Sequence, residues 1–141
     1  MKKFALLALT LGCCGLGAAL HTPVAQAKPQ SVSITSVVMA RGYNGSKATG
    51  VTKVFKPSNR KIHCVVELNR VATVTAKGAW YAVDAAGMHN FKIVEASLPK
   101  QLASQLHFNA SLPRDWPVGK YRVDIYVNGK MMRSVPYSIA K

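Results

Sequence analysis

The side chains best suited to chemistry are three histidines and one cysteine, His63, Cys64, His89 and His107. Blue-copper sites combine two histidines, a cysteine and a weak axial methionine, and a reactive thiolate needs a nearby base and partial exposure. His63 adjoins Cys64, but neighbouring residues of a strand point to opposite faces, and His89 lies beyond the following predicted strand. We therefore interpret Cys64 as a buried core residue, and keep a copper protein or a small enzyme using these four residues as the alternative function.

Carboxylates are scarce, with five Asp and Glu in the whole chain. Glycoside hydrolysis needs two carboxylates held a short, fixed distance apart, whereas these stand singly along the sequence. A Gly-x-Ser-x-Gly nucleophile elbow is also missing from the sequence. We therefore predict a protein that is not an enzyme, with no catalytic residue, no cofactor and no metal. The carboxylates are Glu67, Asp84, Glu95, Asp115 and Asp124.

Basic residues dominate the charge, because 19 Lys and Arg give a formal net charge of +14. Such a charge favours an anionic partner. Nucleic-acid binding normally shows a basic stripe interleaved with exposed aromatic residues. The basic residues here are spread almost evenly, so the sequence argues against nucleic acid. An anionic envelope polymer, a lipid surface or another exported protein remains as the partner. The candidate contacts are Lys53, Lys56, Arg60 and Lys61, which flank one predicted turn, and Arg122 on a late strand.

The first 27 residues have the three parts of a secretory signal peptide. Lys2 and Lys3 precede an uncharged, mostly apolar stretch over 4–20, and Ala25-Gln26-Ala27 has the small-x-small pattern of a cleavage site. The glycines of this stretch make a poor spanning helix, and the predicted mature chain has no transmembrane span. We therefore predict an exported protein, periplasmic or extracellular, with a signal peptide over 1–27 and one domain over 28–141.

Cleavage after Ala27 changes both the charge and the cysteine count. It removes two lysines and leaves a net charge of +12, and it removes Cys13 and Cys14, so that Cys64 has no intramolecular disulfide partner. The exported domain must then rely on its apolar core, for which its length is sufficient. The alternative to cleavage is a lipid anchor at Cys13 or Cys14, because Leu11-Gly12-Cys13 loosely resembles a lipoprotein cleavage box.

Apolar residues of the remaining chain recur with a period of two, which indicates β-strands. Alternation is clearest over 62–68 and 121–127, and Asn128-Gly129 is a strong hairpin signal. A bend is expected at Gly78, and Pro136 places its strand at an edge. About eight strands with regular turns predict an all-β, antiparallel sandwich or barrel. The predicted strands are 31–40, 51–55, 62–68, 72–84, 91–96, 106–110, 121–127 and 131–139, with one helical turn over 98–104 and loops over 41–50, 57–61 and 85–90.

Four residues of this pattern resemble the immunoglobulin framework. Immunoglobulin-type domains show a cysteine, then a core tryptophan, then Tyr-x-Cys near the start of a late strand. Here Cys64, Trp80 and Tyr121-Arg122-Val123 follow that order, with valine at the second cysteine position. The stretch from Trp116 to Tyr121 also resembles the entry to a late strand in secreted bacterial immunoglobulin-like or fibronectin-like modules.

The resemblance implies a single β-sandwich of about seven or eight strands. It also implies that Cys64, Trp80, Tyr121 and Val123 form the structural core, with Tyr121 as a tyrosine-corner residue and Cys64 facing Val123. Such sandwiches host many functions. The sequence therefore predicts an exported, non-enzymatic binding or structural module of the bacterial cell envelope. The alternative is a periplasmic copper-binding protein or a small exported enzyme that uses the three histidines or the cysteine.

Overall fold

The structure, a computed structural model, describes residues 31–141 as one compact unit, so the predicted signal peptide and both leader cysteines lie outside the described residues. Residues 31–141 form seven strands and no helix, which confirms the all-β prediction. This part of the chain accordingly offers no helix long and apolar enough to cross a bilayer. The strands are β1 (Ile34–Tyr43), β2 (Ala48–Val51), β3 (Val54–Phe55), β4 (Lys61–Ala85), β5 (Met88–Ser111), β6 (Gly119–Val127) and β7 (Lys130–Ile139).

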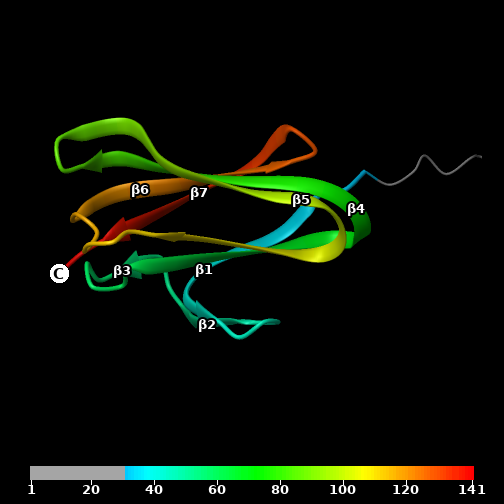
Figure 1. The fold of residues 1–141 in the computed structure, drawn as a ribbon, viewed down its shortest axis with the longest axis horizontal. Coiled ribbons are helices and arrows are strands. Elements are labelled where there is room, and N and C mark those ends of the chain that lie inside the picture. The colour runs from blue at the N-terminus through cyan, green and yellow to red at the C-terminus, as the bar shows by residue number, and fades with distance from the viewer. Residues whose placement is uncertain (1–30) are drawn as a thin grey trace, which may run out of the picture. The chain divides into compact units, whose positions relative to one another are not determined.

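All seven strands belong to one hydrogen-bonded sheet that curls over itself. The order is β2-β1-β4-β6-β7-β3, and β5 pairs with β4. β1 pairs with residues 63–68 of β4 and β6 pairs with residues 76–85, so the two ends of this long strand serve different halves of the sheet. Figure 1 shows the β4–β5 hairpin turning over, so that β1 and β2 lie on one side and β6 and β7 on the other. The predicted sandwich of separate antiparallel sheets is therefore corrected to one curled sheet, in which β3 and β7 are parallel.

Two predicted breaks in the chain are not present. The predicted strands 62–68 and 72–84 are one strand, β4, because an irregularity between Glu67 and Ala72 takes up the polar residues between them. The predicted helical turn over 98–104 is wrong, because these residues continue β5 and pair with β4. The backbone N–H and C=O groups of these residues thus form hydrogen bonds with a neighbouring strand, whereas in a helix they would bond within the segment itself.

The tight turns follow the sequence signals. Asn128 and Gly129 have φ values of 52° and 80°, and Ala86 and Gly87 have 52° and 75°. Positive φ at both central residues is the geometry of two-residue hairpin loops, so both predicted turns are confirmed. Pro136 pairs with Arg122, while β3 covers the other edge of β7 only near its end. The edge position predicted for this proline is also confirmed.

The core lies between the two halves of the curled sheet. Trp80, Cys64 and Val123 are fully buried, and Tyr121 is nearly so. The Tyr121 hydroxyl donates a hydrogen bond to the Pro117 carbonyl oxygen at 2.6 Å, which ties the chain entering β6 to the core. These inward residues leave their alternate neighbours on β4 and β6 on the outer face.

Gly78 has a different role from the predicted bend. A Cβ there would lie 3.1 Å from a ring carbon of Trp80 and 3.2 Å from one of Phe108. The glycine therefore makes room for two large rings of the core.

Candidate functional site

The outer face of the paired strands β4 and β6 carries an alternating set of cations and tyrosines. Lys77 is the direct register partner of Tyr126, and Tyr81 is the direct partner of Arg122. Asp124 lies between the two pairs on β6. We call these five residues the cation–tyrosine face. Side chains of a strand alternate between its two sides. The neighbours of these five residues along each strand point into the core, so the five side chains lie on the outer face.

Each cation lies over the ring of its partner. The Lys77 Nζ is 4.6 Å from the centroid of the Tyr126 ring, and the Arg122 Cζ is 4.4 Å from the centroid of the Tyr81 ring. Both distances fall within the range of cation–π attraction. The face therefore presents positive charge and aromatic surface at two places, four residues apart along each strand.

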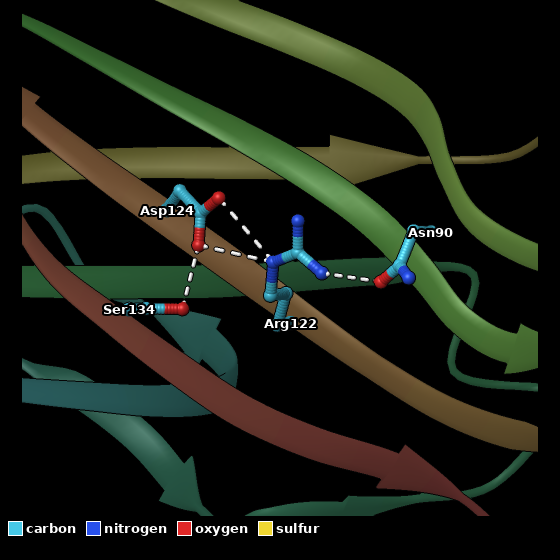
Figure 2. Close-up of polar contacts among 4 residues, drawn as sticks. All are labelled: Asn90, Arg122, Asp124 and Ser134. Atoms are coloured by element: carbon cyan, nitrogen blue, oxygen red, sulfur yellow. Dashed lines mark hydrogen bonds and ion pairs between the residues drawn. The ribbon is translucent and has the colours of Figure 1, made fainter.

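Arg122 is held by polar contacts with Asp124 of its own strand and with Asn90 of β5 (Figure 2). Its Nε donates to Asp124 Oδ2 at 3.3 Å, and its Nη1 donates to Asn90 Oδ1 at 2.8 Å. Asp124 is nearly buried and also accepts a hydrogen bond from the Ser134 hydroxyl at 2.6 Å. The hydrogen bonds that the guanidinium makes within residues 31–141 use Nε and Nη1 and leave Nη2 without an acceptor there. Arg122 is thus a positioned donor with bonding capacity left for an anion.

Two lysines share one carboxylate beside this face. Glu95 on β5 lies 2.5 Å from the Lys92 Nζ and 3.6 Å from the Lys77 Nζ. The hydrogen bond to Glu95 raises the pKa of Lys92, and the same bond lowers the pKa of Glu95. Lys92 and Glu95 are therefore both charged at neutral pH, and the carboxylate offsets part of the positive charge of this face.

The structure separates the basic residues that the sequence grouped around one turn. Arg122 lies on the cation–tyrosine face, and Lys53 lies at the rim of a hollow at the end of that face. Arg60 instead forms an ion pair with Asp115 at 3.2 Å. Lys56 and Lys61 are exposed beside the same turn.

Sequence reasoning missed Lys77 and Tyr81. The inward position of Trp80 implies that its neighbour Tyr81 points outward. However, nothing in the sequence identifies the residues of β6 that these side chains meet.

His63 and His107 are brought together on the outer face of the other half of the sheet. His63 Nδ1 and His107 Nε2 are 2.8 Å apart and share one hydrogen bond, and the Tyr43 ring stacks on His107 at 3.9 Å. Burial, followed by the charge of Lys61, lowers the pKa of His63. Burial, then His63 and Lys61, lowers the pKa of His107. The pair is therefore neutral at neutral pH.

The other two candidate residues lie elsewhere. His89 is exposed near the β4–β5 turn, with its Nδ1 3.6 Å from Asp84 Oδ1. Cys64 points into the core, where burial raises its pKa to about 12, so the thiol stays protonated. Within residues 31–141, no three His, Cys, Asp or Glu side chains are grouped so that they could hold a metal ion. The four residues thus do not form one site.

Known proteins resemble this chain in structure. No protein-family profile matches the chain, and no curated protein matches it in sequence. A solved structure of the Pseudomonas fluorescens alkylpurine DNA glycosylase AlkC, bound to DNA containing an abasic site analog, matches over 78% of this chain with 17% identity and a TM-score of 0.47. The chain spans only 30% of the length of that protein.

This neighbour corrects several sequence-based interpretations. Neither the family profiles nor the curated proteins support the predicted resemblance to immunoglobulin-like or fibronectin-like modules, and the neighbour is named as a DNA glycosylase, so that prediction is corrected. The neighbour's name, a DNA glycosylase bound to DNA, runs against the exclusion of enzymes and the argument against nucleic acid, so neither prediction is kept. The exported non-enzymatic envelope module is set aside with its alternative, the copper protein or small enzyme. A likeness at this identity and TM-score does not itself assign an activity or a partner to this chain.

Proposed function

We propose that the cation–tyrosine face binds single-stranded nucleic acid. The observation that carries the proposal is the register of β4 and β6, which twice sets a cation directly opposite a tyrosine on one outer face. Proteins that bind single strands combine a positive surface, which follows the phosphates, with aromatic rings on which bases stack. The excess of basic residues over the whole chain adds long-range attraction for a polyanion.

The polar contacts of Arg122 support a phosphate-binding role for its side chain. Asp124 and Asn90 fix the guanidinium over Tyr81, so little side-chain freedom remains to be lost when a phosphate binds. A single strand suits this surface better than a duplex, because a duplex hides the base faces that Tyr81 and Tyr126 would contact. Phosphates would then contact Arg122 and Lys77, with bases against the two rings.

We also propose export of the chain, on the basis of the leader pattern over 1–27. Its support is the order of the positive, apolar and small-residue segments. Expression of the full chain in a bacterium, followed by fractionation and N-terminal sequencing, tests this separately. A mature N-terminus at Lys28 is the expected result, and an intact N-terminus at Met1 in the cytoplasm would contradict it.

Binding is tested by fluorescence anisotropy with a fluorescein-labelled oligothymidylate, titrated at several salt concentrations. Tyr81→Ala and Tyr126→Ala should each weaken binding by about 1–3 kcal/mol, the usual contribution of one base stacked on one ring. Tyr43→Ala is the matched control, because this tyrosine lies in the other half of the sheet. If all three variants weaken binding equally, charge alone attracts the oligonucleotide. The same conclusion follows if Tyr81→Ala and Tyr126→Ala leave binding unchanged and polyphosphate binds as tightly as the oligonucleotide.

Glu95 offers a variant that should gain affinity. Glu95→Gln removes the carboxylate that engages Lys77 and Lys92, and leaves both lysines free for phosphates. Binding should tighten at low salt, and the salt dependence should steepen by about one phosphate contact. Glu67→Gln changes the net charge equally but lies in the other half of the sheet, beside Gln105. If both variants tighten binding equally, the effect is one of net charge and the proposed location is wrong.

A further inference from the structure

A hollow lies at one end of the cation–tyrosine face. It has a volume of about 360 Å³ and is formed where β3, β4, β6 and β7 meet. Its surface is almost entirely apolar, with contributions from Val54, Val83 and Pro136, and the lysines Lys53 and Lys120 are also among the residues that line it. Its size falls at the lower end of the range for small-molecule sites.

The hollow continues the row of outward residues on β6. Lys120 precedes Arg122 by two residues and therefore points to the same face. Pro136, which lines the hollow, is the direct register partner of Arg122. On the far side, Lys53 is anchored through its carbonyl oxygen, which accepts a hydrogen bond from the Ser138 backbone at 2.9 Å. A strand lying along the face would therefore reach the hollow next after Arg122.

The position and the charges of the hollow suit the end of a strand. β3 is the last strand of the sheet on this side, so the face ends here. A terminal phosphate carries nearly two negative charges at neutral pH, because its second pKa is about 6, whereas each phosphate within a strand carries one. Two lysines that line one hollow match the doubly charged group, and the apolar surface matches a sugar or base edge.

Resting on the proposed function, we infer that this hollow binds the terminal nucleotide of the strand, with its phosphate monoester between Lys53 and Lys120. The site then distinguishes a phosphorylated end from a hydroxyl end. Ordinary contacts on the cation–tyrosine face do not make that distinction.

The test compares three oligothymidylates of equal length, with a 5′-phosphate, a 3′-phosphate or two hydroxyl ends, by fluorescence anisotropy with an internal label. Wild-type protein should bind one phosphorylated form about three- to tenfold more tightly than the hydroxyl form, the size expected of two exposed ion pairs. Lys53→Gln with Lys120→Gln should abolish that preference. Lys130→Gln with Lys141→Gln removes the same charge elsewhere and should keep it. Thermal melting confirms that each variant is folded.

The outcomes separate this inference from the function on which it rests. Equal affinity for all three ends, with Tyr81→Ala still weakening binding, would overturn the role of the hollow and leave the proposed function intact. A phosphate preference that survives the paired Lys53 and Lys120 substitutions would place the phosphate elsewhere and also overturn it. If none of the oligonucleotides binds, both the proposed function and this inference are wrong.

Discussion

Replacing Arg122 with alanine should destabilise the protein because it leaves a buried carboxylate with one partner. The Asp124 side chain is 8% exposed and the Arg122 side chain 29%, and their closest atoms are 3.3 Å apart. After the substitution, Asp124 would keep only the hydrogen bond from Ser134. Figure 2 shows that Arg122 and Asp124 are the two middle members of a chain of contacts that runs from Asn90 to Ser134.

The expected loss of stability follows from the interactions that Asp124 and Arg122 each lose. Breaking a buried ion pair from one side costs about 3–5 kcal/mol, but the partial exposure of Arg122 lets water reach the carboxylate and reduces this cost. Loss of the contact with Tyr81 adds about 0.5–1 kcal/mol. We therefore expect Arg122→Ala to lower the free energy of unfolding by about 2–3 kcal/mol. Asp124→Ala should cost less, about 1–2 kcal/mol, because the freed guanidinium can turn towards water.

Urea unfolding of the wild type, both single variants and the double variant measures the coupling between these two residues. The double variant should be only about 2 kcal/mol less stable than the wild type, which gives a coupling energy of about 1–3 kcal/mol. Ser134→Ala is a useful companion, expected to cost about 1 kcal/mol through its hydrogen bond. A coupling energy below about 0.3 kcal/mol, the scatter of independent sites, would refute the view that Asp124 holds Arg122 in place.

Three further outcomes are expected from the core, the close approach at β6 and the histidine pair. Trp80→Ala should lower the free energy of unfolding by about 3–5 kcal/mol, and Trp80→Phe by clearly less. The reason is that the buried indole N–H finds no hydrogen-bond partner within residues 31–141, so its removal relieves a desolvation cost. Equal losses in urea unfolding would contradict this. Gly119→Ala should lower the melting temperature, because its Cβ would lie 2.6 Å from the Ala85 Cβ, and an unchanged temperature would show that β6 can shift. Folding lowers the pKa values of His63 and His107 below 6.5. The free energy of unfolding should therefore be highest above pH 6.5 and should decrease as the pH drops below that value, because protonation favours the unfolded state. Urea unfolding at several pH values should show a smaller decrease for His107→Gln than for the wild type.

Local features of the fold were predictable because their signals are local. Positive φ at Gly129 and alternation along β6 depend on a few adjacent residues. Such signals operate within a strand or a two-residue turn, so predictions based on them do not depend on which distant segments pack nearby.

The length of β4 could not be predicted, because a segment distant in sequence supplies the hydrogen bonds of a polar residue within the strand. Asn69 is typical of a turn, and it interrupts the apolar pattern. In the structure its Oδ1 accepts a hydrogen bond from the Ser33 backbone and its own backbone N–H donates to the Ser33 carbonyl, both at 3.0 Å. The segment leading into β1 therefore supplies the contacts that a turn would have made within itself, and the strand continues past this residue.

The candidate site depended on register, which the sequence does not specify. Alternation over 121–127 places Arg122 and Tyr126 on the face opposite the core, but their partners Tyr81 and Lys77 come from a strand far away in sequence. Irregularities in the pairing, such as the one between Ala82 and Asp84, shift the alignment of strands by a residue. A shift of one residue moves every side chain to the other face, so no reading of either strand alone could identify these pairs.

The same dependence on register makes the cation–tyrosine face as rigid as the core beneath it. Moving β4 by one residue against β6 would bring Trp80 to the surface and Tyr81 into the interior. Trp80 and its register partner Val123 are both fully buried, so such a movement exposes the centre of the core. The spacing between the two cation–tyrosine pairs is therefore fixed by hydrophobic burial, and the outer residues do not have to set it themselves. It follows that substitutions on the outer face should alter binding without altering the spacing, whereas core substitutions at Trp80 should disturb both.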